Sequence, residues 1–140
     1  MRKFFVFNIN DEMTILGKKS PYNIYKSLEQ IYKMKKGDII IGTNIYEQLI
    51  DKINIKKLDD ELFKVYKNND YYSKVNNRHI LYNKYRPEDT KMTINNSYLI
   101  IESNAILPSF FKFLSKKQNF FACDFENKDY FWTDELVLSK

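Results

Sequence analysis

The chain of 140 residues has few of the residue types that usually supply chemistry or covalent constraint. Its one cysteine, Cys123, has no partner for an intramolecular disulfide, as is usual for proteins of a reducing cytosol. Its three glycines, Gly17, Gly37 and Gly42, match neither the dinucleotide fingerprint nor a phosphate-binding P-loop. His79 is the one histidine. These shortages exclude a glycine-rich nucleotide loop and leave few side chains for nucleophilic or metal chemistry.

Long hydrophobic runs are also absent. The apolar stretches are far shorter than the roughly 20 residues that cross a bilayer. The apolar start at residues 1–7 gives way to Asn8 and Asn10 before a signal-peptide core could form. We therefore expect a cytoplasmic protein that makes no use of a membrane.

Positive charge comes almost entirely from lysine. The chain carries 23 lysine and arginine residues against 18 acidic residues, a net charge of +5, but its only arginines are Arg2, Arg78 and Arg86. An excess of this size can help binding to an acidic partner or to nucleic acid. Nucleic-acid readers usually rely on arginine, whose planar fork matches phosphates and guanine edges. The composition therefore disfavours direct nucleic-acid binding.

What the chain has in quantity is apolar and aromatic side chains. Hydrophobic residues make up 44% of the sequence, aromatic residues 16% and charged residues 29%. This balance excludes a disordered tail and favours a packed globule. The length fits one compact core, and no linker-like stretch divides it. We therefore predict a single domain over residues 1–140 with a core rich in aromatic rings.

The first half of the chain predicts a strand followed by helices. Residues 3–9 form a β-branched and aromatic run that ends at Asn10, a pattern typical of a strand buried on both faces. Ser20 and Pro21 supply an N-cap and a first helical residue, and apolar residues recur at helical spacing through Tyr32. Beyond them we expect a helix end at Gly37, a short extended piece at 38–41, a helix that Thr43 caps and a helix over 59–66.

In the second half, the pattern of apolar residues has the shorter period that is typical of strands. Asn95 and Asn96 suit the left-handed conformation of a tight hairpin turn, and Pro108 opens a helix. Consecutive strands joined by such short turns pair antiparallel. The predicted fold class is α+β, with a mixed, mostly antiparallel sheet of about five strands and helices packed on it. The strands expected in this half cover residues 78–85, 90–94, 98–102, 120–124 and 129–133.

Few residues could carry catalysis or hold a metal. His79 and Cys123 could pair to form a thiolate, but we interpret His79 as a half-exposed strand residue and Cys123 as a small buried hydrophobe. The acidic residues near the C-terminus lack the spacing of a calcium loop, and turn solvation explains them. We therefore predict no enzyme activity, no catalytic residue, no metal site and no cofactor. The acidic residues are Asp124, Glu126, Asp129, Asp134 and Glu135.

A second hypothesis is a small basic nucleic-acid-binding module. Tyrosines interleaved with basic residues could stack on single-stranded bases, although tyrosine is also a favoured residue on any half-buried strand. Binding of this kind would weaken steeply with salt. The residues concerned are Tyr71, Tyr72, Tyr82 and Tyr85, interleaved with Lys74, Arg78, Lys84 and Arg86.

Three segments are similar to a known family. They are RKFFVFNI at residues 2–9, ILGKKS at residues 15–20 and FFACDFENKDYFW at residues 120–132. Through them the chain resembles the SirA family, the sporulation inhibitors of replication. The apolar strand, the Asp-Phe step, the Asn-containing turn and the final Tyr-x-Trp of the last segment are the most specific part. The middle of the chain, residues 53–85, matches least.

The resemblance implies a protein that binds the N-terminal domain I of the replication initiator DnaA and so restrains origin firing. The implied contacts fall on Met13, Ile15 and Leu16 after the first strand and on Gln48 in a later helical segment. We expect Gln48 and Lys18 to supply a polar rim around the apolar residues. The family has aromatic residues where Met13 and Ile15 stand here. Exposed apolar residues on a connection would suit a docking role. The alternative is that they staple the connection onto the following helix.

Overall fold

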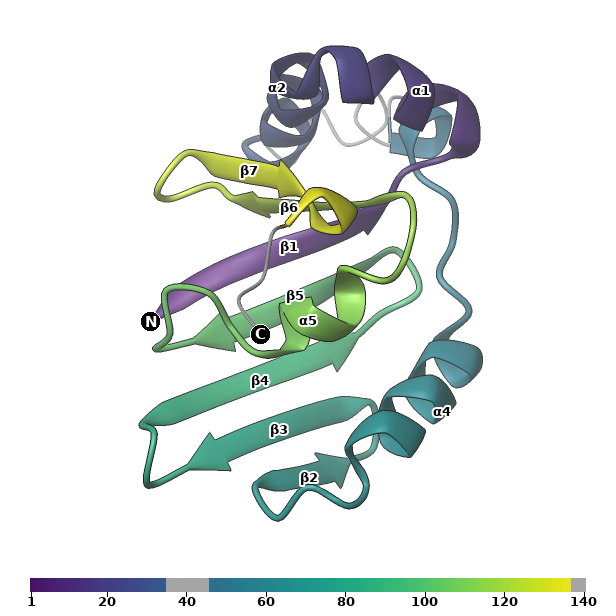
Figure 1. Ribbon diagram of the computed structural model, residues 1–140. Helices are drawn as coiled ribbons and strands as arrows, with labels where there is room; N and C mark the ends of the chain where they lie inside the picture. Colours follow the sequence, from purple (N-terminus) through teal and green to yellow (C-terminus); the bar gives the residue numbers. More distant parts are fainter. Residues whose placement is uncertain (35–45, 137–140) are drawn as a thin grey trace.

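A computed structural model describes residues 1–34 and 46–136, which form an antiparallel sheet with helices on both faces (Figure 1). The strands are β1 (Arg2–Asn8), β2 (Tyr72–Val75), β3 (Arg78–Asn83), β4 (Glu88–Ile94), β5 (Tyr98–Ser103), β6 (Phe120–Asp124) and β7 (Asp129–Trp132). The helices are α1 (Asp11–Lys19), α2 (Pro21–Tyr32), α4 (Ile55–Tyr66), α5 (Phe110–Leu114) and the 3-10 helix η2 (Thr133–Glu135). Residues 46–49 are also helical.

The seven strands follow the order β2-β3-β4-β5-β1-β6-β7, and every described pairing is antiparallel. The predicted α+β class is confirmed, with more strands than the sequence predicted. β2 was not expected because three of its four residues are exposed, so its sequence lacks the alternation of apolar and polar residues that marks a half-buried strand.

One turn prediction is wrong. The left-handed conformation expected at Asn95 and Asn96 is not found there, although the hairpin between β4 and β5 does form. Among the described residues, positive φ angles occur at Asn76 (55°), Lys128 (54°) and Asn119 (73°). The first two lie in the turns between β2 and β3 and between β6 and β7, so a tight hairpin selects this conformation at those turns instead.

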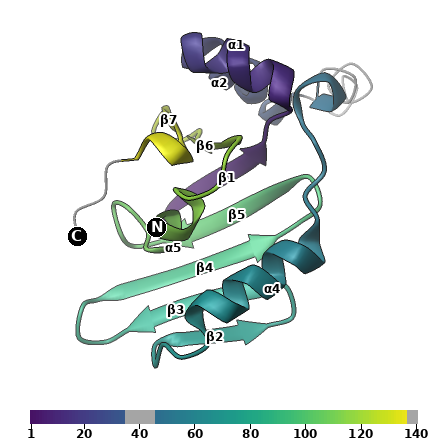
Figure 2. The same ribbon diagram turned by 45° about the vertical axis from the view of Figure 1, so that its right-hand side comes forward.

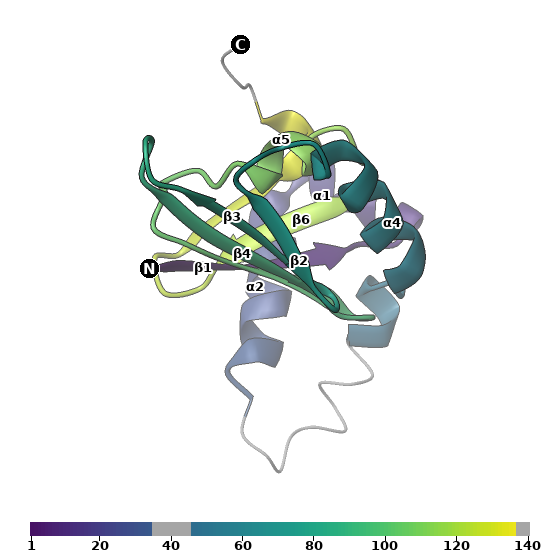
Figure 3. The same ribbon diagram turned by 90° about the horizontal axis from the view of Figure 1, so that it is seen from below.

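The helices divide between the two faces of the sheet. Figure 3 shows α4 and α5 on one side and α2 on the other. In Figure 2, α4 lies along the end of the sheet formed by β2, β3 and β4, whereas α1 and α2 lie at the opposite end, above β6 and β7. None of the helices in the described part of the chain is long and apolar enough to span a membrane.

Two hydrophobic cores result, one on each face. The first packs α4 and α5 against the sheet, with Leu62, Met92 and Phe111 fully buried. The second packs α2 and the segment 46–50 against the other face, with Ile9 and Phe121 fully buried. Aromatic rings meet edge to face or stacked in both cores, as the composition predicted.

β1 contributes to both cores and confirms the prediction of a strand buried on both faces. Phe4 and Val6 point into the first core, whereas Phe7 and the following Ile9 point into the second. β1 is a central strand, paired with β5 on one edge and β6 on the other, and its two faces are covered because a core packs on each side of the sheet.

The segment after β1 is a helix, which corrects the prediction of a non-helical connection. The side chain of Asn10 caps α1 by accepting a hydrogen bond from the backbone N–H of Met13 at 2.9 Å. Acidic residues occupy the first turn and basic residues the last turn, which suits the helix dipole. α2 begins at Pro21 as predicted, but the Ser20 side chain makes no capping hydrogen bond.

α4 begins at Ile55, four residues before the predicted start at residue 59. The Asn54 side chain caps it by accepting from the backbone N–H of Lys57 at 3.1 Å. The predicted helix end at Gly37, the extended piece at 38–41 and the cap at Thr43 lie outside the described residues.

Candidate protein-binding surface

One residue joins α1 to the segment that carries Gln48. The Asn10 backbone N–H donates to the carbonyl oxygen of Leu49 at 2.8 Å, and its side-chain amide donates to the carbonyl oxygen of Gln48 at 2.6 Å. The same side chain caps α1. The N-terminus of α1 and residues 46–49 are therefore held together, although Asn10 and Gln48 are 38 positions apart.

The outward face of α1 carries two large apolar side chains. Ile15 is 64% exposed and Leu16 is 58% exposed. Asp11, Glu12 and Lys19 are also exposed, and the spacing of these five positions places them on one side of the helix. The result is an apolar pair flanked by charged residues.

Met13 and Lys18 lie at the borders of this face. The Met13 side chain is half-buried and packs against the second core. The ammonium of Lys18 lies 2.5 Å from Asp134 and 3.3 Å from Glu135, and 5.1 Å from the centre of the Trp132 ring. Lys18 therefore links α1 to η2. The Gln48 side chain is exposed beside the start of α1.

Gly17 sets the position of α1 on the domain. A Cβ at this position would lie 2.6 Å from Ile24 Cγ1 and 2.8 Å from Trp132 Cζ2, so only glycine permits the observed approach. The buried Trp132 indole N–H donates to the Gly17 carbonyl oxygen at 3.2 Å. Because α1 rests on a buried ring and on α2, Ile15 and Leu16 are presented from a rigid platform.

His79 does not take the half-exposed position that the sequence suggested. It is fully buried, with Nε2 2.7 Å from an Asp59 carboxylate oxygen and Nδ1 2.6 Å from the Tyr72 hydroxyl. A carboxylate only accepts, so Nε2–H donates to Asp59 and Nδ1 accepts from Tyr72. Burial lowers the pKa of His79 and outweighs the opposing effect of Asp59. The histidine thus links α4, β2 and β3 in its neutral form.

Cys123 is a buried hydrophobe, as interpreted from the sequence. It lies in the second core, and burial raises the pKa of its thiol well above the ordinary value. In the sheet order, β4, β5 and β1 separate its strand from that of His79. The two residues therefore cannot form the thiolate pair considered above.

The acidic residues near the C-terminus are largely paired with cations. The Arg2 guanidinium lies 2.9 Å from both Asp124 and Asp129, and Lys18 binds Asp134. Burial would raise the pKa of Asp124, but hydrogen bonds from Asn127 and Arg2 lower it below the ordinary value. Across residues 1–34 and 46–136, no three His, Cys, Asp or Glu side chains gather as a metal-binding group.

The tyrosines and basic residues of the nucleic-acid hypothesis are divided between two faces. Tyr72 and Lys74 face α4, where they contact His79 and Asp59 respectively. Arg78 and Tyr82 alternate with the buried residues of β3 and so lie on the opposite face. The set does not form one continuous surface.

The comparison with protein families gives a match over nearly the whole chain. The model described as sporulation inhibitor of replication protein SirA matches residues 2–136, including the middle segment that resembled the family least. No curated protein matches the sequence. With the α+β fold and the terminal motifs on β1, α1, β6 and β7, the match shows that this chain belongs to the SirA family of sporulation inhibitors of replication.

Proposed function

We propose that this chain restrains replication initiation by binding domain I of DnaA through the α1 surface, defined as Met13, Ile15, Leu16, Lys18 and Gln48. The observation that carries the proposal is the exposure of Ile15 and Leu16 on a helix fixed by Gly17 and Asn10. The family supplies the inhibitory role. DnaA as the partner rests on the likeness of the sequence to that family.

A protein partner suits the chemistry of this surface. Energetic hot spots of interfaces are apolar or aromatic side chains surrounded by polar groups that exclude water. Ile15 and Leu16 supply the apolar centre, and Gln48 and the charged residues of α1 supply the rim. A specific interface covers about 800 Å² on each partner, which one helix face does not provide. Residues 46–49 therefore belong to the contact.

The five residues have different roles in this proposal. Ile15 and Leu16 enter the partner, while the half-buried Met13 supports them from the side of the core. Lys18 holds α1 in place through Asp134 and Glu135 at the edge of the contact. Gln48 offers an exposed amide that can donate and accept hydrogen bonds.

Calorimetric titration of the chain against purified domain I of DnaA tests the proposal. We expect saturable binding that Ile15→Ala weakens by about 2 kcal/mol, or about 30-fold in Kd, because a buried aliphatic anchor is lost. Ile106→Ala is the matched control, since Ile106 is 83% exposed and lies before α5, away from α1. Its Kd should equal that of the unmodified chain.

Two results would contradict the proposal. The first is the absence of saturable heat with the unmodified chain. The second is an Ile15→Ala variant that binds as tightly as Ile106→Ala while its circular dichroism spectrum is unchanged.

A further inference from the structure

Two hollows lie along α4 on the face of the sheet opposite to α2. The first has a volume of about 310 Å³ and is formed by the start of α4, the end of β1 and the segment at Lys117 and Phe120. The second has a volume of about 420 Å³ and lies between Val65 and Tyr66 of α4 and the residues of α5 and its C-terminal extension. Volumes above about 300 Å³ are typical of small-molecule sites.

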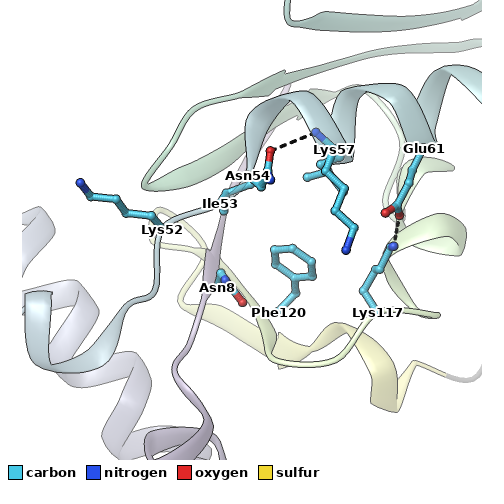
Figure 4. A pocket seen from close by; sticks show the side chains of 9 residues that line it. Asn8, Lys52, Ile53, Asn54, Lys57, Glu61, Lys117 and Phe120 are labelled. Atoms are coloured by element: carbon cyan, nitrogen blue, oxygen red, sulfur yellow. Dashed lines mark hydrogen bonds and ion pairs between the residues drawn. The ribbon is translucent and has the colours of Figure 1, made fainter.

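The charge of these hollows is strongly one-sided. Lysines line both of them, and Glu61 is the one carboxylate among their described lining residues. Figure 4 shows the Lys57 side chain directed into the first hollow beside Phe120, whereas Lys52 extends away from it. Among the described residues, no carboxylate lies within 4.0 Å of the Lys57 ammonium. The lining lysines are Lys52, Lys57 and Lys117 in the first hollow and Lys112, Lys116 and Lys117 in the second.

Lys117 joins the two hollows. Its side chain lines both, pairs with Glu61 across the space between α4 and the segment after α5, and lies 5.3 Å from the centre of the Phe113 ring. Lys57 and Val65 are separated by about 12 Å along the helix axis, from the rise of 1.5 Å per residue. A ligand that touches both hollows must therefore pass the Lys117–Glu61 pair.

We propose that this α4–α5 groove, the two hollows together, binds a phosphate-bearing small molecule of nucleotide size. The first hollow offers the Lys57 ammonium and the side-chain amide of Asn8 to phosphate oxygens (Figure 4), and the second offers the apolar surface of Tyr66, Val65 and Phe113 to the remainder of the ligand. The short span of the groove, about 12 Å along α4, favours a compact ligand over a nucleic-acid strand, which needs a longer path for its backbone.

The probe for this site is ATP, titrated into the isotope-labelled full chain at low ionic strength and followed by amide chemical shifts. Pyrophosphate, adenosine and a short mixed-sequence oligonucleotide are titrated in parallel. We expect ATP to bind more tightly than pyrophosphate, adenosine to bind weakest, and the shifts to concentrate in α4 and α5. Affinity should fall with salt, because the contacts are between exposed charges.

Three variants test whether ATP binds in this groove or is attracted to any surface lysine. Lys57→Gln should weaken ATP binding about tenfold, the size expected for loss of a hydrogen bond between charged groups. Glu61→Gln should strengthen it, since Lys117 is then released toward the phosphate. Lys56→Gln, next to Lys57 but outside both hollows, should have no effect. Binding to domain I of DnaA should be unchanged in all three, because none of the three substituted residues belongs to the α1 surface.

Four results would overturn the proposal. They are no shift with ATP at millimolar concentration, equal affinity for ATP and pyrophosphate, an equal effect of Lys56→Gln and Lys57→Gln, or tighter binding of the oligonucleotide than of ATP. Each can occur whether or not the α1 surface binds DnaA.

Discussion

Because His79 is buried in its neutral form, the stability of the fold depends on pH in mildly acidic solution. Its imidazole is enclosed by Asp59, Tyr72 and the nearby Lys74, whose ammonium lies 2.6 Å from Asp59. The charges that face His79 are thus one carboxylate and one ammonium, both already paired with each other. A proton added to Nδ1 would take away the acceptor of the Tyr72 hydroxyl. The folded state therefore favours the neutral ring.

Stability should fall as the pH drops from 7.5 to 5.5. The pKa of His79 in the fold lies below its ordinary value of 6.5, so the unfolded chain binds a proton first as the pH falls through 6.5. The free energy of unfolding therefore falls between pH 6.5 and the folded-state pKa of His79. Below that pKa, His79 causes no further loss. Urea unfolding at both pH values measures the change.

The control for this prediction is His79→Gln, which cannot titrate in that range. Its stability should depend less on pH between 5.5 and 7.5 than that of the unmodified chain. Greater stability of the unmodified chain at pH 5.5 than at pH 7.5 would show that the sign is wrong.

Helix caps decide where α1 and α4 begin. Asn10 and Asn54 each cap a helix through the same hydrogen bond to the N–H three residues on. Asn10 differs in one respect, because its amide also holds the carbonyl oxygen of Gln48. Removing each cap in turn therefore distinguishes a loss of stability, which both caps cause, from a displacement of the α1 surface, which only Asn10 controls.

Asn10→Ala and Asn54→Ala should each reduce stability by about 1 kcal/mol, the usual cost of losing a cap, with Asn10→Ala the more costly. Only Asn10→Ala should weaken binding to domain I of DnaA, since it frees α1 from residues 46–49. Chemical denaturation and calorimetry measure the two effects. Equal loss of binding in both variants would indicate that stability alone controls affinity.

The elements with strong periodicity were predicted from the sequence. The β-branched and aromatic run of β1 and the helical spacing of α2 are local signals. α1 was missed because nine residues that include Gly17 give a weak pattern, although Asn10 and the charges at both ends were visible signs. The meeting of Asn10 with Gln48, and of His79 with Asp59, depends on tertiary packing across 38 and 20 positions. No local pattern encodes such contacts.

At the scale of the whole molecule, two cores share one sheet. β1 sends side chains into both, and β6 does the same through Phe120 and Phe121. Neither core can open without disturbing strands that support the other. The prediction of a single domain over residues 1–140 therefore leads to one cooperative unfolding transition.

Tryptophan fluorescence and far-ultraviolet circular dichroism should give coincident urea unfolding curves. Trp132 is the one tryptophan of the sequence and lies buried in the second core against α1, so its fluorescence reports on that core. Circular dichroism reports on the helices and sheet of both faces. Separate midpoints for the two signals would mean that the cores unfold as independent units.

The arrangement of β1 and α1 has a consequence for how the sequence can change over evolution. Val6 has no exposed surface, and its strand has neighbours on every side. Ile15 and Leu16, only a few positions later, touch mainly solvent. Substitutions at these two helix positions leave the interior intact, so the proposed α1 surface can diverge between lineages while the scaffold that presents it is conserved.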